Sequence, residues 1–316
     1  TGENVENLKD GTGNQALSLP KTCGSLVWTK RVGADDGQFL GGATFSLSPA
    51  DITLEGLDPR TIADNGEEDL DPRDGYFATD DIVPGDYMLT ETTVPAGYYG
   101  ASEPRKVTIT AGDQTETGAF INYLGSIAFT KATKGDAMAL VPGATFTITA
   151  LSGPAAQAPW DLDTNPIIVK DNAEHDDDAN GGQFMVTGLP MGMYSVTETT
   201  RPVGYDLDAA TGYANVVNAK TAAVFASQMP QEGDQPYVFQ DTMRLAPIQI
   251  SKSDQTSGLP LNGATFILCK DSKESEDFDP AVDCAPENQI QTLTSGDDGN
   301  GVAISKPLPF GMYWVW

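Results

Sequence analysis

The sequence predicts an all-β chain of tandem, domain-sized modules, the third of them incomplete. Its 33 glycines and 21 prolines in 316 residues indicate many turns and few long helices. Apolar and polar residues alternate in short segments, as in strands that bury one face. Two blocks of sequence also recur three times, and 39% hydrophobic residues suffice for several small cores.

The first repeated block opens each module. It occurs at residues 24–47, 125–148 and 246–268. Every copy carries a lysine followed by Gly-Ala-Thr-Phe. The lysines are Lys30, Lys131 and Lys252, and they lie about 100 and about 120 residues apart. This spacing is that of a small β domain rather than of a solenoid repeat.

Two further blocks set the module boundaries. The second block occurs at residues 74–98, 180–205 and 300–316. The third occurs twice, as Ala119–Asn122 and Val238–Asp241, just before the next module opens. The chain therefore divides into a leader at 1–23 and modules at 24–123, 124–244 and 245–316.

Strand alternation predicts which residues face the core. In the first strand, Leu26 and Trp28 occupy alternate positions and Lys30 follows on the same face. The same parity applies to the other modules, to the glutamate strand and to the last strand. The core-facing sets are Lys30, Glu91 and Asn122 in module 1, and Lys131, Glu198 and Asp241 in module 2.

Buried ionisable groups of this kind form a reactive combination. Burial favours the neutral amine of a lysine and the protonated acid of a glutamate. A neutral amine could attack the Asn carboxamide or Asp carboxyl, releasing ammonia or water, while the glutamate moves protons. An unreacted, hydrogen-bonded network is the alternative, and spacing and parity alone leave both open.

The repeated residues also carry a family resemblance. The strand lysine, Gly-Ala-Thr-Phe, Tyr-x-x-x-Glu-Thr-x-x-Pro-x-Gly-Tyr and the terminal Phe-x-Asn/Asp resemble the collagen-adhesin B-type (CnaB, SpaA-like prealbumin) modules of Gram-positive pilins and adhesin stalks. The resemblance covers residues 24–316. It implies immunoglobulin-like β-sandwiches, Lys30–Asn122 and Lys131–Asp241 isopeptide bonds, and catalytic roles for Glu91 and Glu198. It also implies attachment by sortase to the cell wall or to other subunits.

The third module departs from this pattern. Tyr313–Trp316 aligns with the residues that precede Glu91 and Glu198, so the glutamate and acceptor strand fall outside the sequence. Lys252 is therefore predicted to have no partner within these residues. We expect the natural protein to continue, and strand donation by another chain is the sharper alternative.

Charge and composition exclude several partner classes. With 18 Lys+Arg against 45 Asp+Glu, the net charge of -27 argues against electrostatic binding to nucleic acid or an anionic membrane. We find no membrane span or signal peptide in the sequence. The lone His175 lies in an acidic run and is expected in a solvated loop, so histidine-based metal or triad chemistry is not expected.

The cysteines and minor motifs have simple interpretations. The spacing of Cys269 and Cys284 permits one bridge, which leaves Cys23 over. The calcium-loop-like run 176–181 aligns with hairpin turns, and we interpret the sortase-like run 19–23 as a linker. Lys170 weakly resembles the lysine that joins shaft pilins. The stretch 150–178 is expected to be a surface loop.

These observations predict a structural stalk or pilus (fimbrial) subunit, extracellular on a Gram-positive cell surface. Its expected partners are sortase and neighbouring pilus or cell-wall components, and no cofactor or metal is expected. The alternative is an adhesin that binds a host surface ligand through loops near Trp160 or at 58–74. A glycosidase is disfavoured because the repeated carboxylates lie in separate modules. Each glutamate would act once per molecule, so the protein is not expected to be an enzyme.

Overall fold

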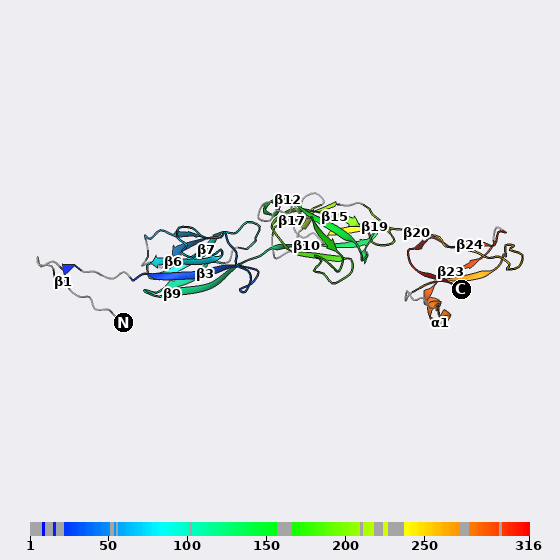
Figure 1. The fold of residues 1–316 in the computed structure, drawn as a ribbon, viewed down its shortest axis with the longest axis horizontal. Helices are drawn as coiled ribbons and strands as arrows, with labels where there is room; N and C mark the ends of the chain where they lie inside the picture. The colour runs from blue at the N-terminus through cyan, green and yellow to red at the C-terminus, as the bar shows by residue number, and fades with distance from the viewer. Residues whose placement is uncertain are drawn as a thin grey trace.

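The protein consists of three β modules that follow one another along a rod (Figure 1). The computed structural model describes residues 22–50, 54, 56–100, 103–156, 166–208, 211–217, 237–271, 278–296 and 299–316. It also gives the backbone of the short strands β1 (Leu8–Lys9), β2 (Gln15–Ala16) and β18 (Val224–Ala226). The predicted all-β, tandem-module fold is confirmed. No helix among the described residues is long and apolar enough to cross a membrane.

Module 1 is a sandwich of two sheets. One sheet has the order β6–β3–β9, formed by β6 (Tyr76–Ile82), β3 (Gly24–Val32) and β9 (Gln114–Asn122). The facing sheet has the order β5–β4–β7–β8, formed by β5 (Arg60–Ala63), β4 (Thr44–Pro49), β7 (Gly85–Thr93) and β8 (Arg105–Ile109). The first and last strands, β3 and β9, are neighbours and run parallel.

Module 2 repeats this plan with additional strands. Its first sheet contains β10 (Gly125–Thr133), β11 (Asp136–Leu140), β14 (Gln183–Leu189), β16 (Tyr205–Asp206) and β19 (Tyr237–Met243). Its second sheet contains β12 (Thr145–Ser152), β13 (Ile167–Lys170), β15 (Gly192–Thr200), β17 (Thr211–Val216) and β18. Here too the first and last strands, β10 and β19, are parallel neighbours.

The prediction of a surface loop over 150–178 is wrong in part. Strand β12 continues to Ser152, a 3-10 turn follows at Pro154–Ala156, and β13 pairs with β12 as an edge strand. The run Ile167-Ile168-Val169 is β-branched and buries Val169, which explains why a strand forms inside this polar stretch.

Four contacting aromatic rings fill the same positions in both complete modules. They are Trp28, Phe45, Phe77 and Phe120 in module 1, and Phe129, Phe146, Phe184 and Phe239 in module 2. Trp28 stacks on Phe77 with ring centroids 4.9 Å apart, and Phe129 stacks on Phe184 at 4.8 Å. The phenylalanine of Gly-Ala-Thr-Phe lies at the centre of each cluster.

A glycine beside the strand lysine of modules 1 and 2 fixes the turn that leads into β6 or β14. Gly75 and Gly182 have φ of 73° and 78°, and their carbonyls accept hydrogen bonds from the backbone N–H of Lys30 and Lys131. A Cβ on Gly75 would lie 2.6 Å from the backbone nitrogen of Leu40. Only glycine suits both the left-handed backbone and the close approach.

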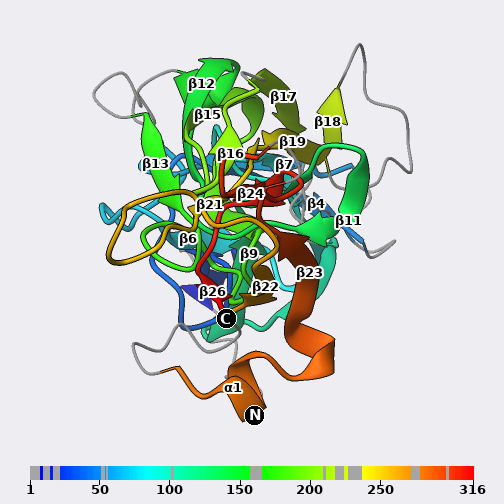
Figure 2. The same cartoon turned by 90° about the vertical axis from the view of Figure 1, so that its right-hand side faces the viewer.

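Module 3 has smaller sheets and a disulfide. Its strands are β20 (Leu245–Ala246), β21 (Gln249–Ser251), β22 (Thr265–Lys270), β23 (Gln289–Thr294), β24 (Val302–Ile304), β25 (Leu308–Pro309) and β26 (Tyr313–Val315). The pairs β20–β25 and β21–β24 and the three-stranded sheet β23–β22–β26 make up the module. Helix α1 (Pro280–Asp283) projects to one side, as the view along the rod shows (Figure 2).

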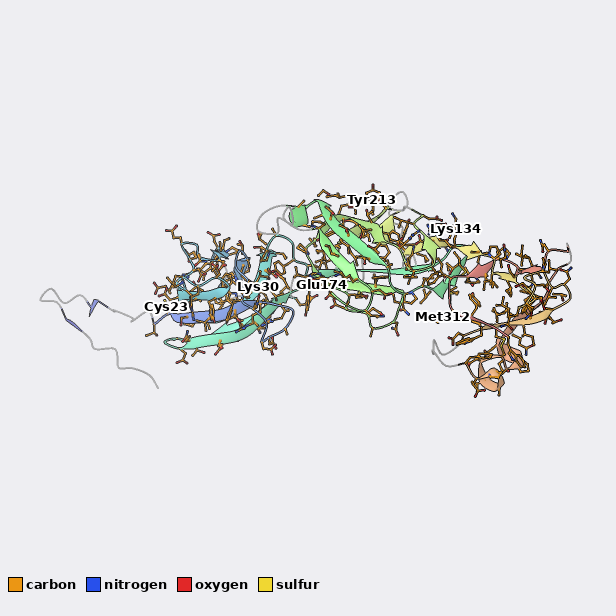
Figure 3. All side chains as sticks on the ribbon, turned by 45° about the vertical axis from the view of Figure 1, so that its right-hand side comes forward. Cys23, Lys30, Lys134, Glu174, Tyr213 and Met312 are labelled. Atoms are coloured by element: carbon orange, nitrogen blue, oxygen red, sulfur yellow. A yellow bond between two sulfur atoms is a disulfide. The ribbon has the colours of Figure 1, made fainter. Side chains whose placement is uncertain are left out.

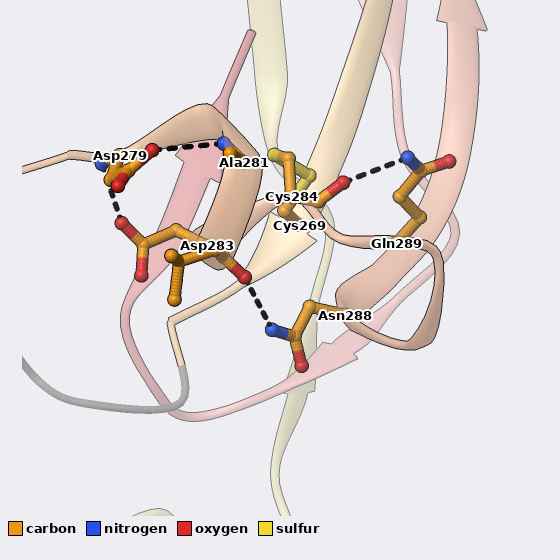
Figure 4. Close-up of a disulfide and its surroundings, with 8 residues drawn as sticks. Cys269, Asp279, Ala281, Asp283, Cys284, Asn288 and Gln289 are labelled. Carbon is orange, nitrogen blue, oxygen red and sulfur yellow. Dashed lines mark hydrogen bonds between the residues drawn. A yellow bond between two sulfur atoms is a disulfide. The ribbon is translucent and has the colours of Figure 1, made fainter.

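The disulfide joins Cys269 on β22 to Cys284 at the end of α1 (Figure 4). Both cysteines are buried, and the Cys284 carbonyl accepts a hydrogen bond of 2.9 Å from the side chain of Gln289. Asp279 caps α1 by accepting from the N–H of Ala281 at 3.0 Å. The bridge therefore fastens the α1 segment to the central strand of this sheet.

Removing the bridge is expected to destabilise module 3 alone. The double substitution Cys269→Ser with Cys284→Ser opens a loop of about 15 residues, which the chain-entropy model values at about 3 kcal/mol. Hydrogen exchange of β22 and β23 measures the loss, and Cys23→Ser is the matched control. Equal protection of these strands in the bridged and unbridged proteins would contradict the prediction.

Candidate functional site

In module 1, Lys30, Glu91 and Asn122 meet inside the sandwich. Strands β3 and β9 pair with Lys30 opposite Phe120 and Val32 opposite Asn122, so the lysine and the asparagine lie on one face of one sheet. Glu91 reaches them from β7 of the facing sheet. Its Oε1 lies 3.2 Å from Lys30 Nζ, and all three residues are buried. Figure 3 shows Lys30 within the module and Cys23 at its outer end.

The carboxamide nitrogen of Asn122 is held by acceptors on several sides. It donates to Oε2 of Glu91 at 3.1 Å, to the carbonyl of Ile121 at 3.3 Å and to the carbonyl of Gly100. Its Oδ1 is buried without a hydrogen-bond partner among the described residues. Glu91 therefore contacts the amine through one oxygen and the amide nitrogen through the other.

Burial shifts the lysine of module 1 toward its neutral form. Desolvation lowers the pKa of Lys30 to about 8, against the opposing effect of Glu91. The positive charge of Arg105 lowers the pKa of Lys30 further. That guanidinium lies 4.0 Å from the ring centroid of Phe120, the residue opposite Lys30. A usable fraction of nucleophilic amine therefore exists near neutral pH.

Module 2 builds the same constellation with an aspartate. Lys131 lies opposite Phe239 and Thr133 opposite Asp241, the same register as in module 1. Lys131 Nζ is 2.7 Å from Oε2 of Glu198 and 2.7 Å from Oδ1 of Asp241. All three side chains are almost fully excluded from solvent.

Burial favours the protonated form of Glu198 in module 2. Desolvation raises the pKa of Glu198 to about 7, Lys131 opposes this rise, and the neighbouring Asp241 adds to it. Glu198 Oε1 and Asp241 Oδ2 are buried and have no hydrogen-bond donor among the described residues. A proton on Glu198 would remove the buried negative charge that two carboxylates and one ammonium leave uncompensated.

An aromatic wall closes each site from solvent. Phe120 contacts Phe45 with ring centroids 4.9 Å apart, and Phe239 contacts Phe146 at 4.8 Å. The low local dielectric strengthens the interactions among amine, acid and acceptor. Both sites thus place a nucleophile, a proton carrier and an electrophile together in a dry core.

Lys252 of module 3 is exposed, so the prediction that it faces a core is wrong for this structure. It follows β21, which pairs only with β24 among the described strands. In modules 1 and 2 the strands β9 and β19 cover the lysine, and the described part of module 3 has no strand in that place. Strand parity gives the direction of a side chain, but burial needs a neighbouring strand as well.

The acidic loops use their carboxylates to hold their own backbones. Asp69 accepts from the N–H of Asn65, Asp71 and Ala78, and Asp176 accepts from Asn172, Asp178 and Met185 in the equivalent positions. The run 176–181 is a loop that ends in the turn before β14. No cluster of three potential metal ligands occurs in the described part of the chain. His175 is exposed in this loop, as predicted. Trp160 lies outside the described residues.

Three contributors to the sites were not predicted from the sequence. They are the Gly100 carbonyl, the Asp208 N–H, which donates to Oδ1 of Asp241 at 3.1 Å, and the Arg105 guanidinium. Gly100 and Asp208 follow the repeated Pro-x-Gly-Tyr sequence by two and three residues. This shared position was the one sequence feature that could have pointed to them. Arg105 has no such marker, because it begins β8, which lies outside every repeated block.

Comparisons with known proteins place the fold. The model of the SpaA family, a prealbumin-like fold domain, matches residues 24–122, 125–228 and 246–316. No curated protein matches the chain. Similar solved structures include the Bacillus anthracis TIE protein, at 20% identity and a TM-score of 0.44, covering 93% of this chain and 45% of that one.

Two pilins are also similar in fold. The streptococcal ancillary pilin shows 17% identity and a TM-score of 0.29, with 72% of this chain and 64% of that chain covered. The shaft pilin SpaA from Lactobacillus rhamnosus GG shows 16% identity and a TM-score of 0.27, with 70% and 98% covered. This chain thus spans less than half of the TIE protein and about two thirds of the ancillary pilin. Because the SpaA domain model accounts for most of its length in three consecutive matches, the chain belongs to the SpaA family of prealbumin-like fold domains.

Proposed function

We propose that the protein is a structural stalk or pilus subunit of a Gram-positive cell surface, stabilised by self-formed Lys30–Asn122 and Lys131–Asp241 isopeptide bonds. The observation that carries the proposal is the buried triad found twice in the same strand register. A stability role alone does not require a lysine, a glutamate and an amide or acid in a dry core, since apolar residues would serve as well.

In module 1 the glutamate is placed to move a proton from nucleophile to leaving group. Neutral Lys30 Nζ attacks Cγ of Asn122, the Nζ–Cγ bond forms and the Cγ–Nδ2 bond breaks. Glu91 contacts Nζ through Oε1 and Nδ2 through Oε2, so it can accept a proton from the amine and return it to the departing nitrogen. The products are a secondary amide and ammonia.

In module 2 the leaving group is water. The Asp241 carboxyl must be neutral to react, and Glu198, whose pKa burial raises to about 7, is the neighbouring acid that can pass it a proton. Lys131 Nζ bonds to Cγ, the Cγ–Oδ2 bond breaks, and the amine proton leaves with Oδ2 as water. Each glutamate returns to its starting state, but its site is consumed, so the chemistry occurs once per molecule.

The bonds suit a load-bearing role outside the cell. Each would join the first strand of a module to its last, so tension between the modules would pass through covalent bonds rather than through a hydrogen-bonded ladder. An amide also resists reduction, unlike a disulfide. Sortase and neighbouring pilus or cell-wall components are the partners that such a subunit would need. A host-binding role through the long loops remains the alternative prediction.

Intact mass tests the proposal directly. The denatured protein is expected to weigh less than its sequence by about 17 units for the Asn bond and about 18 for the Asp bond, the masses of ammonia and water. Glu91→Ala should abolish the first mass loss and Glu198→Ala the second, so that each variant regains the ammonia or water of its unformed bond. An exposed glutamate, Glu116→Ala, is the control and should change neither. A wild-type mass equal to the sequence mass would refute the bonds.

The two bonds are expected to form with opposite pH dependence. Lys30 has a pKa of about 8. Below that pH, each drop of one pH unit lowers the fraction of neutral amine about tenfold, so the bond of module 1 forms more slowly. Glu198 has a pKa of about 7, so its protonated form is lost above that pH and bond formation in module 2 slows. Cell-free synthesis, acid quenching and peptide mass measure both rates in one chain. Parallel pH profiles would contradict this assignment of roles.

A further inference from the structure

The two sites differ in which atom of the acceptor the neighbouring loop holds. In module 1, Nδ2 of Asn122 donates to the carbonyl oxygen of Gly100. In module 2, the backbone N–H of Asp208 donates to Oδ1 of Asp241 at 3.1 Å. Both backbone groups belong to the segment after Pro-x-Gly-Tyr, which we call the cap loop: Tyr98–Gly100 and Tyr205–Asp208.

The held atoms have different fates in the reaction. Nδ2 of Asn122 leaves as ammonia, and a carbonyl beside it orients the amide and accepts from the nitrogen as it gains a proton. Oδ1 of Asp241 stays as the new amide oxygen, and an N–H beside it stabilises the charge that develops there in the tetrahedral intermediate. Each cap loop therefore has the polarity that its own acceptor requires.

The cap loops are anchored in place by their modules. In module 1, Tyr99 and Tyr123 exchange two backbone hydrogen bonds of 2.8 Å, which tie the loop to the end of β9. In module 2, the equivalent strand β16 pairs with β19, with Asp206 opposite Thr242. The side chain of Asp208 also accepts from Lys134 and Thr242, at 2.7 and 2.9 Å. The loop backbone is thus positioned relative to the acceptor before any bond forms.

We propose that the cap loop determines which acceptor, carboxamide or carboxyl, reacts in each module. This inference rests on the isopeptide chemistry proposed above and adds its specificity. An ionised aspartate at position 122 would place a carboxylate oxygen against the Gly100 carbonyl, so two acceptors would face each other in a dry site, and only the protonated acid could donate to that carbonyl. An asparagine at position 241 can instead turn its own carbonyl oxygen to the Asp208 N–H. Module 1 therefore requires an asparagine as acceptor, whereas module 2 accepts either an aspartate or an asparagine.

Exchanging the acceptors tests the proposal in the full chain. Protein from cell-free synthesis is quenched at fixed times at pH 7.5, and peptide masses report the bonded fraction in each module. Asn122→Asp is expected to bond at least ten times more slowly than wild type, whereas Asp241→Asn bonds readily with a loss of about 17 units. Wild-type speed for Asn122→Asp, or a folded but unbonded Asp241→Asn, would overturn the inference.

A second pair of variants isolates the backbone donor. Asp208→Pro removes the N–H, and Asp208→Ala keeps it while removing the same carboxylate. The alanine variant is expected to bond module 2 about 100 times faster than the proline variant, the usual worth of one such donor. Bond formation in module 1 and hydrogen exchange of β19 show that the chain has folded. Equal rates for the two variants would exclude a role for the N–H.

These outcomes separate the inference from the proposed function. A wild-type protein without either mass loss would refute the isopeptide bonds and the cap-loop role together. A wild-type protein with both losses, alongside an Asn122→Asp variant that bonds equally fast, would refute only the cap-loop role.

Discussion

Glu198→Ala is expected to abolish the bond in module 2 and to lower the free energy of unfolding of that module by about 5 kcal/mol. The bond would close a loop of about 110 residues, and the chain-entropy model assigns about 4.7 kcal/mol to a loop of about 100. Lys131 and Asp241 would remain as a buried ion pair without the glutamate that now contacts the amine. Denaturant unfolding with intact mass on the same sample measures both effects.

The matched variant for this experiment is Glu198→Gln. Glutamine keeps the size of the side chain and can accept a hydrogen bond from Lys131, but it cannot exchange the proton. Loss of the bond in both variants would assign the effect to proton transfer, whereas bond formation in Glu198→Gln would show that the glutamate only positions the amine. Module 1 in the same chain should keep its loss of about 17 units in either variant.

Strand parity predicted the composition of both sites because alternation decides the face of each side chain. Lys30, Glu91 and Asn122 sit on core positions of three strands, and the sandwich brings them together once its two sheets pack. Repetition strengthened the prediction, since the same parity occurs at Lys131 and Asp241. The local pattern of the chain was therefore sufficient to identify the buried polar groups.

The features that the sequence did not predict depend on backbone position rather than on side-chain identity. Gly100 and Asp208 act through a carbonyl and an N–H, which every residue except proline carries, so their types gave no signal. Arg105 acts through its place above Phe120, which the path of β8 determines. Strand parity alone does not predict burial, as Lys252 shows. Its position in the strand pattern matches that of Lys30, but the described strands leave it exposed.

Under tension, modules 1 and 2 are expected to stay at their folded length. Force that enters β3 would pass through the Lys30–Asn122 bond into β10, and then through the Lys131–Asp241 bond, without loading the enclosed strands. Single-molecule pulling through the two ends of the chain should therefore show no unfolding step for either module. Glu91→Ala combined with Glu198→Ala should add two steps of about 30 and about 35 nm, because about 90 and 110 residues each extend by about 3.4 Å.

Module 3 provides the internal control for each trace. Its lysine is exposed, and its Cys269–Cys284 bridge encloses only a short segment, so it should extend in the wild type and in the double variant alike. One step in the wild type and three in the variant would locate the inextensible regions between the bonded residues. Unfolding steps from module 1 or 2 in a wild-type protein whose mass shows that both bonds have formed would place the bonds outside the path of the force.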